Sequence, residues 1–143
     1  MAAKSNTFRN DLLKLIFNGT AISGLADNAA APLTTLYLAL HTSDPGDAGN
    51  QSTSEVTYTG YTRVAVVRTS GGWTVSGGSV SPTNPIEFGE MSGGTAGTAT
   101  YATIGTDSTG SGKVLYRGAL TPTIPFNVGV TPRLRTTTTI TEE

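Results

Sequence analysis

The residue that most invites a catalytic interpretation is His41, the only histidine of the chain. A serine–histidine–aspartate relay would have to be built around it, with Ser43 and Asp44 as its neighbours. Successive side chains of an extended strand point to opposite faces, so adjacency does not bring these three groups together. The chain also has no G-x-S-x-G segment, which carries the nucleophile of many hydrolases. We therefore predict that His41 is a structural residue at the end of a strand.

A pair of carboxylates could hydrolyse a glycosidic bond, and the candidates for such a pair are Glu87, Glu90 and Asp107. A groove that cleaves carbohydrate would normally bring several aromatic side chains to stack on the sugar rings. The chain has a single tryptophan, Trp73, and its place in a β-rich run indicates a core residue. We predict that the protein is not an enzyme and has no catalytic or cofactor-binding residue.

Oxygen ligands for calcium could come from the polar run 42–55, which contains Asp44, Asp47, Asn50 and Glu55. Their spacing is not that of an EF-hand loop, which needs alternate ligands, a central glycine and a glutamate at its twelfth position. The sequence Asp-Pro-Gly-Asp at 44–47 is instead typical of a simple turn. We expect no metal site.

A phosphate-binding loop is suggested by residues 105–113, which read GTDSTGSGK. The motif needs glycine where Asp107 stands, and a serine or threonine where Val114 stands. A β-rich run follows, whereas the motif requires a helix. These residues therefore predict a glycine-rich loop between two strands.

Charge is sparse: 13% of the 143 residues are charged, with nine Lys and Arg against ten Asp and Glu. The basic residues are scattered singly, which argues against a nucleic-acid partner. No apolar run is long enough to span a membrane, and no convincing signal peptide opens the chain. A surface so rich in glycine, threonine and serine is common where it lies against other subunits. The absence of cysteine excludes disulfides and thiolate metal sites.

The elements that would position these groups are mostly strands. One helix is predicted over 7–18, capped by Asn6 or Thr7 and ended by Gly19. Its apolar stripe, at helical spacing, consists of Phe8, Leu12, Leu15 and Ile16. A linker is expected over 20–33. Strands are predicted over 34–41, 56–69, 73–76, 86–88, 98–105, 113–120, 124–128 and 133–141.

This density of strands and turns predicts a mainly β fold: an antiparallel β-sandwich, jelly-roll-like, with a short N-terminal α-helix. The size predicts a single domain over 1–143, with helix and linker in 1–33 and the sandwich in 34–143. A bend or bulge is expected at Gly60 in the long 56–69 strand.

The segment 133–141 reads RLRTTTTIT and is predicted to be a terminal strand, either an edge that pairs with a neighbouring chain or an internal strand. One of its faces carries the residues that we predict to contact a partner: Arg133, Arg135, Thr137 and Thr139. The two arginines could pair with carboxylates of a neighbouring subunit.

Two blocks carry a resemblance: LYLALHTSDPGDAGNQSTSEVTYTGYTRVAV at 36–66 and GTATYATIGTDSTGSGKVLYRGAL at 97–120. In the first block, Leu36, Leu38 and Leu40 alternate with other residues and so share one face of a strand. Together the blocks resemble small virion proteins of tailed bacteriophages, of the tail fibre or capsid decoration (cement) type.

The resemblance implies a structural protein of the virion, assembled in the bacterial cytoplasm. Because the chain shows no repeats, heptads or long shaft, we expect a cement protein that bridges capsomers and stabilises the DNA-filled head. Its partners would be the major capsid protein, copies of itself, or both. The alternative is a short tail-fibre or tail-associated protein involved in host attachment, and a carbohydrate-binding module ranks third.

Overall fold

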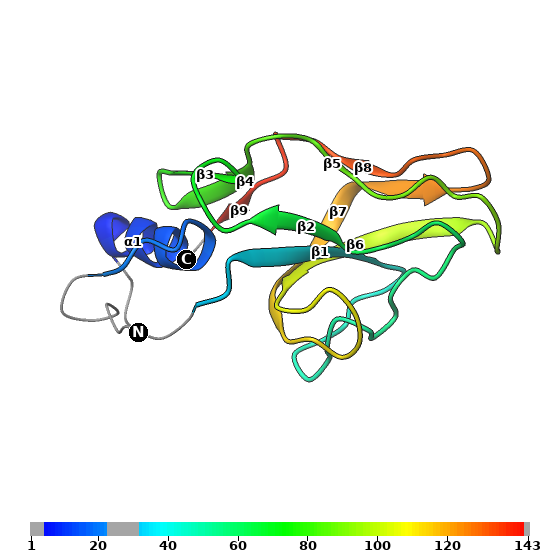
Figure 1. The fold of residues 1–143 in the computed structure, drawn as a ribbon, viewed down its shortest axis with the longest axis horizontal. Helices are drawn as coiled ribbons and strands as arrows, with labels where there is room; N and C mark the ends of the chain where they lie inside the picture. Colours follow the sequence, from blue (N-terminus) through cyan, green and yellow to red (C-terminus); the bar gives the residue numbers. More distant parts are fainter. Residues whose placement is uncertain (1–4, 23–31, 142–143) are drawn as a thin grey trace. The chain divides into compact units, whose positions relative to one another are not determined.

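The fold is that of a computed structural model, which describes residues 5–22 and 32–141 (Figure 1). These residues form one helix and nine strands, which are α1 (Asn6–Phe17), β1 (Thr35–His41), β2 (Val64–Val67), β3 (Trp73–Ser76), β4 (Ser79–Pro82), β5 (Ile86–Glu87), β6 (Gly97–Gly105), β7 (Val114–Phe126), β8 (Arg133–Leu134) and β9 (Ile140–Thr141). The strand orders of the three sheets are β2-β1-β6-β7, β3-β4-β9 and β5-β8. Within the described residues, no helix is long and apolar enough to cross a membrane.

The predicted class is confirmed at the coarser level: the described chain is mainly β, its sheets are antiparallel, and one short helix precedes them. The strand orders do not show a jelly roll, so the jelly-roll-like sandwich stays a prediction. The chain divides into two compact units. One consists of 1–35, 66–85 and 135–143, and the other of 36–65 and 86–134. The single domain over 1–143 also stays a prediction.

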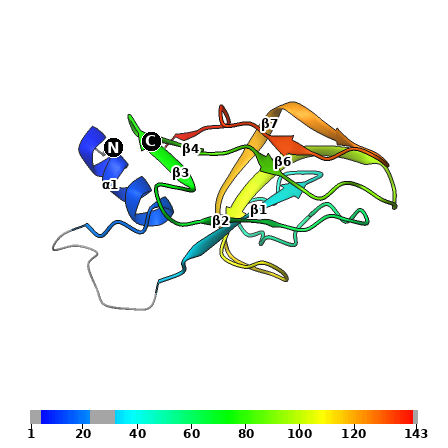
Figure 2. The same ribbon diagram turned by 45° about the horizontal axis from the view of Figure 1, so that its top comes forward.

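Helix α1 packs on β3 and β4 within the first unit, and both ribbon views show it beside these strands (Figures 1 and 2). The expected buried stripe is wrong in its position. Leu13 and Phe17 are fully buried, whereas Leu12, Leu15 and Ile16 are half-buried, and the side chain of Phe8 lies outside the described part. The ring of Phe17 meets Trp73 edge-on at a centroid distance of 4.7 Å. Because the second half of this helix carries apolar residues on several sides, at 12, 13 and 15–17, the position of its partner strands selects the buried pair.

The ends of α1 follow from backbone hydrogen bonds. The Ser5 carbonyl accepts the first helical bond from the Arg9 amide at 3.0 Å, so Ser5, not Asn6 or Thr7, holds the cap position. Gly19 has a φ of +64° and ends the helix as predicted. Residues 23–31 of the expected linker lie outside the described part.

Arg68, which follows β2, covers the C-terminal end of α1. Its guanidinium donates to the carbonyls of Leu15 and Ile16, and also to the Leu33 carbonyl at 2.8 Å. A helix leaves its last carbonyls without intrahelical donors and carries partial negative charge at that end. Arg68 therefore satisfies these carbonyls and opposes their charge.

Strand β1 is buried on both faces. Its alternating leucines are at most 4% exposed, and Ala39 and His41 on the other face are fully buried. It pairs with β6 in an antiparallel register that places Leu38 opposite Ile104 and His41 opposite Tyr101. The prediction of a strand over 34–41 is thus confirmed, within one residue at its start.

The strand expected over 56–69 is wrong for most of its length, because only Val64–Val67 form β2. Before β2, the chain makes an isolated bridge between Thr59 and Gly93 and turns at Gly60, whose φ is +101°. A Cβ at Gly60 would lie 2.1 Å from the carbonyl oxygen of Glu90. The chain thus makes this close backbone contact at Gly60, where the prediction had a continuous ladder of strand hydrogen bonds.

Two further strand predictions are corrected. Strand β4, with the sequence SVSP, was not predicted, and it pairs with β3 so that Val75 lies opposite Val80. The strands expected over 113–120 and 124–128 are one strand, β7, which pairs with β6 through an irregularity near Ala99. The β6–β7 hairpin encloses residues 106–113, which confirms the predicted glycine-rich loop between two strands.

Candidate functional site

The predicted partner-contact segment does not form one strand. Leu134 pairs with Ile86 in the β5–β8 sheet, whereas Ile140 pairs with Val80 in the β4–β9 sheet. Between them the chain turns, with the Thr138 amide donating to the Arg135 carbonyl at 3.0 Å. The threonines have high β propensity, but they do not form a strand here, because Leu134 and Ile140 on either side of them pair in different sheets.

The four predicted contact residues are all exposed, but they belong to different units. Arg133 forms an ion pair with Glu87 across the β5–β8 sheet, and both side chains are more than half exposed. Arg135, Thr137 and Thr139 lie in the turn segment of the other unit. Their role in contacting a partner stays a prediction.

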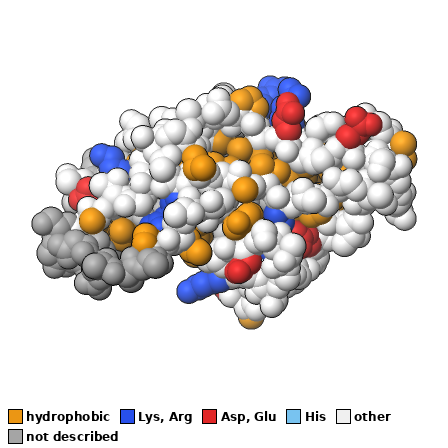
Figure 3. Space-filling view, in the orientation of Figure 1, with side chains coloured by type: hydrophobic (Ala, Val, Ile, Leu, Met, Phe, Trp, Pro, Cys, Tyr) orange, Lys and Arg blue, Asp and Glu red, His pale blue; other side chains and the backbone are white. Residues whose placement is uncertain are grey.

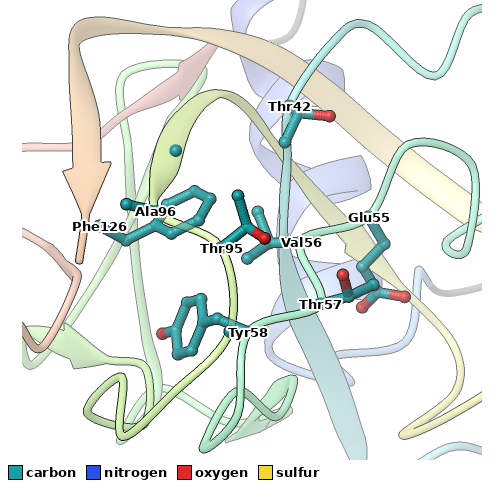
Figure 4. A pocket seen from close by; sticks show the side chains of 10 residues that line it. Thr42, Glu55, Val56, Thr57, Tyr58, Thr95, Ala96 and Phe126 are labelled. Atoms are coloured by element: carbon teal, nitrogen blue, oxygen red, sulfur yellow. The ribbon is translucent and has the colours of Figure 1, made fainter. Parts of the chain in front are cut away.

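A pocket of about 510 Å³ lies within the second unit, where four segments meet (Figure 4). These segments are the end of β1, the chain at 55–58, the loop at 94–97 and the end of β7. Figure 4 shows the rings of Tyr58 and Phe126 on one side and Thr42, Glu55 and Thr57 on the other. No sequence pattern pointed to this pocket, because its residues come from places far apart in the chain.

Backbone hydrogen bonds fix the walls of the pocket. The amides of Thr42 and Val56 donate to the carbonyls of Ser54 and Leu40, each at 2.9 Å. The amide of Thr59 donates to the Gly93 carbonyl at 2.9 Å and so joins the chain at 55–58 to the start of the 94–97 loop. The pocket is thus formed by ordered backbone on two sides.

The base of the pocket is apolar and tightly packed. Val56, Tyr58 and Phe126 are each at most 5% exposed, and the two rings lie 5.3 Å apart between centroids. The Tyr58 hydroxyl donates to the Gly89 carbonyl at 2.7 Å, and burial raises the pKa of Tyr58. A Cβ on Gly97 would lie 2.8 Å from the Phe126 ring, so only glycine lets the chain pass over that ring.

A buried ion pair supports the pocket at Glu55. Arg63 donates from Nε and Nη2 to the two carboxylate oxygens of Glu55, each at 2.8 Å, and its side chain is 3% exposed. The Tyr61 hydroxyl also donates to Glu55, at 3.1 Å, and burial raises the pKa of Tyr61. The hydrogen bond to Glu55 raises the pKa of Arg63. Such a bidentate pair is strong and fixes both side chains.

The same arginine organises the glycine-rich loop. Its Nη1 donates to the Asp107 carbonyl at 2.9 Å and its Nη2 to the Gly110 carbonyl at 2.6 Å. The guanidinium of Arg63 thus donates its hydrogen bonds within its own unit, to one carboxylate and to carbonyls of the loop. Sequence reasoning missed this cluster, since neither Arg63 nor its loop partners follow a recognisable motif.

His41 is a structural residue, as predicted. Its Nδ1 lies 2.8 Å from the Thr53 carbonyl oxygen, which can only accept, so Nδ1 carries the proton. Its Nε2 then accepts from the Thr103 hydroxyl, also at 2.8 Å. Ser43 and Asp44 take no part. Burial lowers the pKa of His41, although the Thr53 carbonyl and Glu55 oppose this shift.

The acidic loop at 42–55 has protein partners for its carboxylates. Asp44 accepts the Gly46 amide at 2.9 Å, which lowers the pKa of Asp44. The hydrogen-bonded backbone turn lies over 46–49, two residues later than predicted, with the Gly49 amide donating to the Gly46 carbonyl at 3.3 Å. Arg117 on β7 forms ion pairs with Asp44 at 2.6 Å and with Asp47 at 2.5 Å. Within the residues that the structure describes, no group of three or more metal-ligating side chains is found.

The carboxylates considered for glycoside hydrolysis have separate surroundings. Glu87 pairs with Arg133, and Asp107 accepts a hydrogen bond from the Thr106 hydroxyl at 2.5 Å. Glu90 is exposed on the chain between β5 and β6. Trp73 is 1% exposed and belongs to the core, as predicted.

Comparison with known proteins gives one family. The model of the family described as "Podophage GP4 fiber I protein gp80" matches residues 3–141, which is nearly the whole chain. A search of curated proteins finds no match.

Proposed function

The chain belongs to the Podophage GP4 fiber I protein gp80 family, and from this membership we propose that it is a tail-associated fiber subunit that helps the phage attach to its host. As a member of this family, the protein is a structural, non-enzymatic component of the phage virion, in a fiber. Attachment to the host goes beyond the membership, and it rests on the usual purpose of a fiber that projects from a virion.

The observation that carries the proposal is the family match over residues 3–141. The sequence alone favoured a capsid decoration protein and kept the tail fibre as the alternative. The family description names a fiber, and it therefore supports the alternative over the decoration role. No feature of the described residues favours capsomer bridging.

The surface of the protein is compatible with a structural role among other subunits. Figure 3 shows one face on which charged side chains are few, among apolar side chains and larger areas of uncharged polar groups and backbone. Packing against neighbours then requires little removal of water from charges, which is costly. This feature suits a fiber subunit and a decoration protein equally.

Locating the protein in the virion tests the proposal. Immunogold labelling or cryo-electron microscopy should place it at the tail, and virions that lack it should adsorb poorly to host cells while their heads keep wild-type heat resistance. Label on the head, with normal adsorption and early release of DNA on heating, would instead establish the decoration role.

We also propose that contact with a neighbouring subunit includes Arg135, together with Arg133, Thr137 and Thr139. The neighbour would be a copy of this chain or another virion protein, and the major capsid protein stays the partner under the decoration alternative. Arg133 is already paired with Glu87, whereas Arg135 has no ion-pair partner within the described residues. Arg135→Ala should therefore lower the amount of the protein in virions more than Arg133→Ala does. Equal incorporation of both variants at the wild-type level would rule out this contact.

A further inference from the structure

The pair Asn18–Gly19, at the C-terminal end of α1, is the one place in the chain where glycine follows asparagine. The backbone nitrogen that follows an asparagine can attack the side-chain amide of that asparagine. Glycine obstructs such an attack least, because it has no side chain and lets other groups approach its backbone closely. Whether the reaction occurs in a folded protein depends on how the two reacting groups are held.

The reacting nitrogen, the Gly19 amide, has no hydrogen-bond acceptor within the described residues. The amides on either side of it, those of Asn18 and Thr20, both donate to the Lys14 carbonyl, at 2.9 Å and 3.0 Å. Gly19 itself has a φ of +64°, which turns the chain out of the helix. No backbone bond therefore has to break before this nitrogen loses its proton.

Arg68 accounts for the unpaired amide. By helical spacing the Gly19 amide would donate to the Leu15 carbonyl, four residues earlier. The guanidinium of Arg68 instead donates to that carbonyl and to the carbonyl of Ile16. The end of α1 is thus completed by a side chain, and the Gly19 nitrogen is left as a possible nucleophile.

The side chain under attack is also unrestrained at its oxygen. Asn18 Oδ1 is buried and has no hydrogen-bond partner within the described residues. Two other asparagines are held: Asn10 Oδ1 accepts the Gly78 amide at 2.6 Å, and Asn50 Oδ1 accepts the Ser52 amide at 2.9 Å. A buried oxygen without a donor gains nothing from staying in place. The Asn18 side chain can therefore rotate toward the nitrogen that follows it without losing a bond at this oxygen.

We propose that Asn18 deamidates spontaneously in the folded protein and that the product loosens the end of α1. Hydroxide removes the proton of the Gly19 amide, and the nitrogen forms a bond to Asn18 Cγ. The bond from Cγ to Nδ2 breaks, and ammonia leaves after taking a proton from water. A second water then opens the cyclic imide at one of its two carbonyls and leaves aspartate or isoaspartate at this position.

The product places a carboxylate where the helix does not favour one. The C-terminal end of a helix carries partial negative charge, so a new anion there is repelled. The carboxylate also competes with the carbonyls of Leu15 and Ile16 for the guanidinium of Arg68. Because a virion protein is not replaced after assembly, the product accumulates with the age of the particle.

The test compares the full chain, folded in mildly alkaline buffer, with the same chain unfolded in guanidinium chloride. Peptide mass spectrometry follows the loss of asparagine at each position, and an isoaspartate methyltransferase labels the rearranged product. A reaction that required global unfolding would be slowed by about a thousandfold or more in the folded chain, the ratio of folded to unfolded molecules. We expect Asn18 to be slowed by less than about a hundredfold. A larger slowing overturns the proposal.

Asn50 is the internal control in the same samples, because its oxygen is bonded and the amide of Gln51 that follows it donates to the Gly112 carbonyl at 2.9 Å. It should stay unmodified in the folded chain while Asn18 reacts. Loss of asparagine at the same rate at both positions would show that the arrangement at the end of α1 has no influence, and it overturns the proposal.

Two variants test the effect on α1. Asn18→Asp carries the product charge from the start and should unfold at a lower urea concentration than fresh wild type. Asn18→Gln keeps the amide, but its longer side chain would have to close a larger ring, so an aged sample should unfold at the same urea concentration as a fresh one. Aged wild type should move toward Asn18→Asp. An Asn18→Asp chain as stable as wild type, or an equal loss of stability in aged Asn18→Gln, overturns the effect on α1.

Discussion

Gln51 shows how a single buried polar side chain can determine the residues around it. It is fully buried, its Oε1 accepts the Asp107 amide at 3.0 Å, and its backbone amide donates to the Gly112 carbonyl at 2.9 Å. A Cβ on Gly105 would lie 2.1 Å from Gln51 Cδ, and one on Gly112 would lie 2.1 Å from Gln51 Oε1. Both glycines are therefore needed to admit this side chain.

We expect Gly112→Ala to destabilise the protein by about 1–3 kcal/mol, as a methyl group forced into a filled space does. The measurement is the midpoint of urea-induced unfolding, compared between variants whose free energy of unfolding depends on urea concentration with the same slope. Gly118→Ala is the matched control, because a Cβ there meets nothing within 4 Å. Equal midpoints for the two variants would show that the Gln51 side chain can move aside without cost.

The buried imidazole of His41 should make stability depend on pH. Burial holds the pKa of His41 below its ordinary value of 6.5, so the unfolded chain binds a proton more readily than the folded one. The free energy of unfolding should therefore fall as pH drops through about 6.5, by no more than about 1.4 kcal/mol per pH unit.

His41→Gln is the diagnostic variant for this effect, because the chain has no other histidine. Denaturation at a series of pH values between about 5 and 7, where a histidine titrates, should give a slope for wild type and a flatter line for the variant. The same slope in both would assign the pH dependence to another group. The lowered pKa of Asp44 acts in more acidic solution and does not interfere.

At the scale of elements, α1 is held by its buried side and by Arg68 at its C-terminal end. We expect Leu13→Ala to cost about 2–5 kcal/mol, as a large-to-small change in a core. Leu12→Ala, on a half-buried position of the same helix, should cost clearly less. Denaturant titration of the two variants measures the difference, and a larger loss for Leu12→Ala would restore the stripe inferred from periodicity.

The loop at 42–55 is held by its own hydrogen bonds and by Arg117. Asp44 accepts the Gly46 amide, and Asn50 accepts the Ser52 amide, each at 2.9 Å. We expect EDTA to leave the melting temperature unchanged, because these carboxylates already have protein partners. A fall of several degrees that calcium restores would show that Asp44 and Asp47 bind a cation in place of Arg117.

At the scale of the whole molecule, the single-domain prediction can be tested by cooperativity. One domain requires one unfolding transition seen by all probes. Trp73 fluorescence reports on the first unit, and the NMR signal of the Thr103 backbone amide, in β6, reports on the second. Leu13→Ala and Gly112→Ala should each shift both signals equally. A shift confined to the probe of the mutated unit would show two units that unfold separately.

The sequence by itself determined the features that depend on local pattern and sterics. Alternating leucines predicted β1, because a strand directs every second side chain to the same face. Gly19 predicted the end of α1, because glycine adopts the left-handed conformation at little cost. The glycine-rich loop between β6 and β7, and the structural role of His41, followed from comparing each motif with what its chemistry requires.

Tertiary structure alone decided the features that depend on residues far apart in the chain. The RLRTTTTIT segment has β propensity throughout. It nevertheless forms two short strands, β8 and β9, because Leu134 and Ile140 pair with different strands. Leu13 is buried because β3 and β4 cover that side of a helix whose second half carries apolar residues on several sides. The pocket was likewise invisible in the sequence. Its base and rim meet only when the chain at 55–58, the 94–97 loop and the end of β7 are brought together.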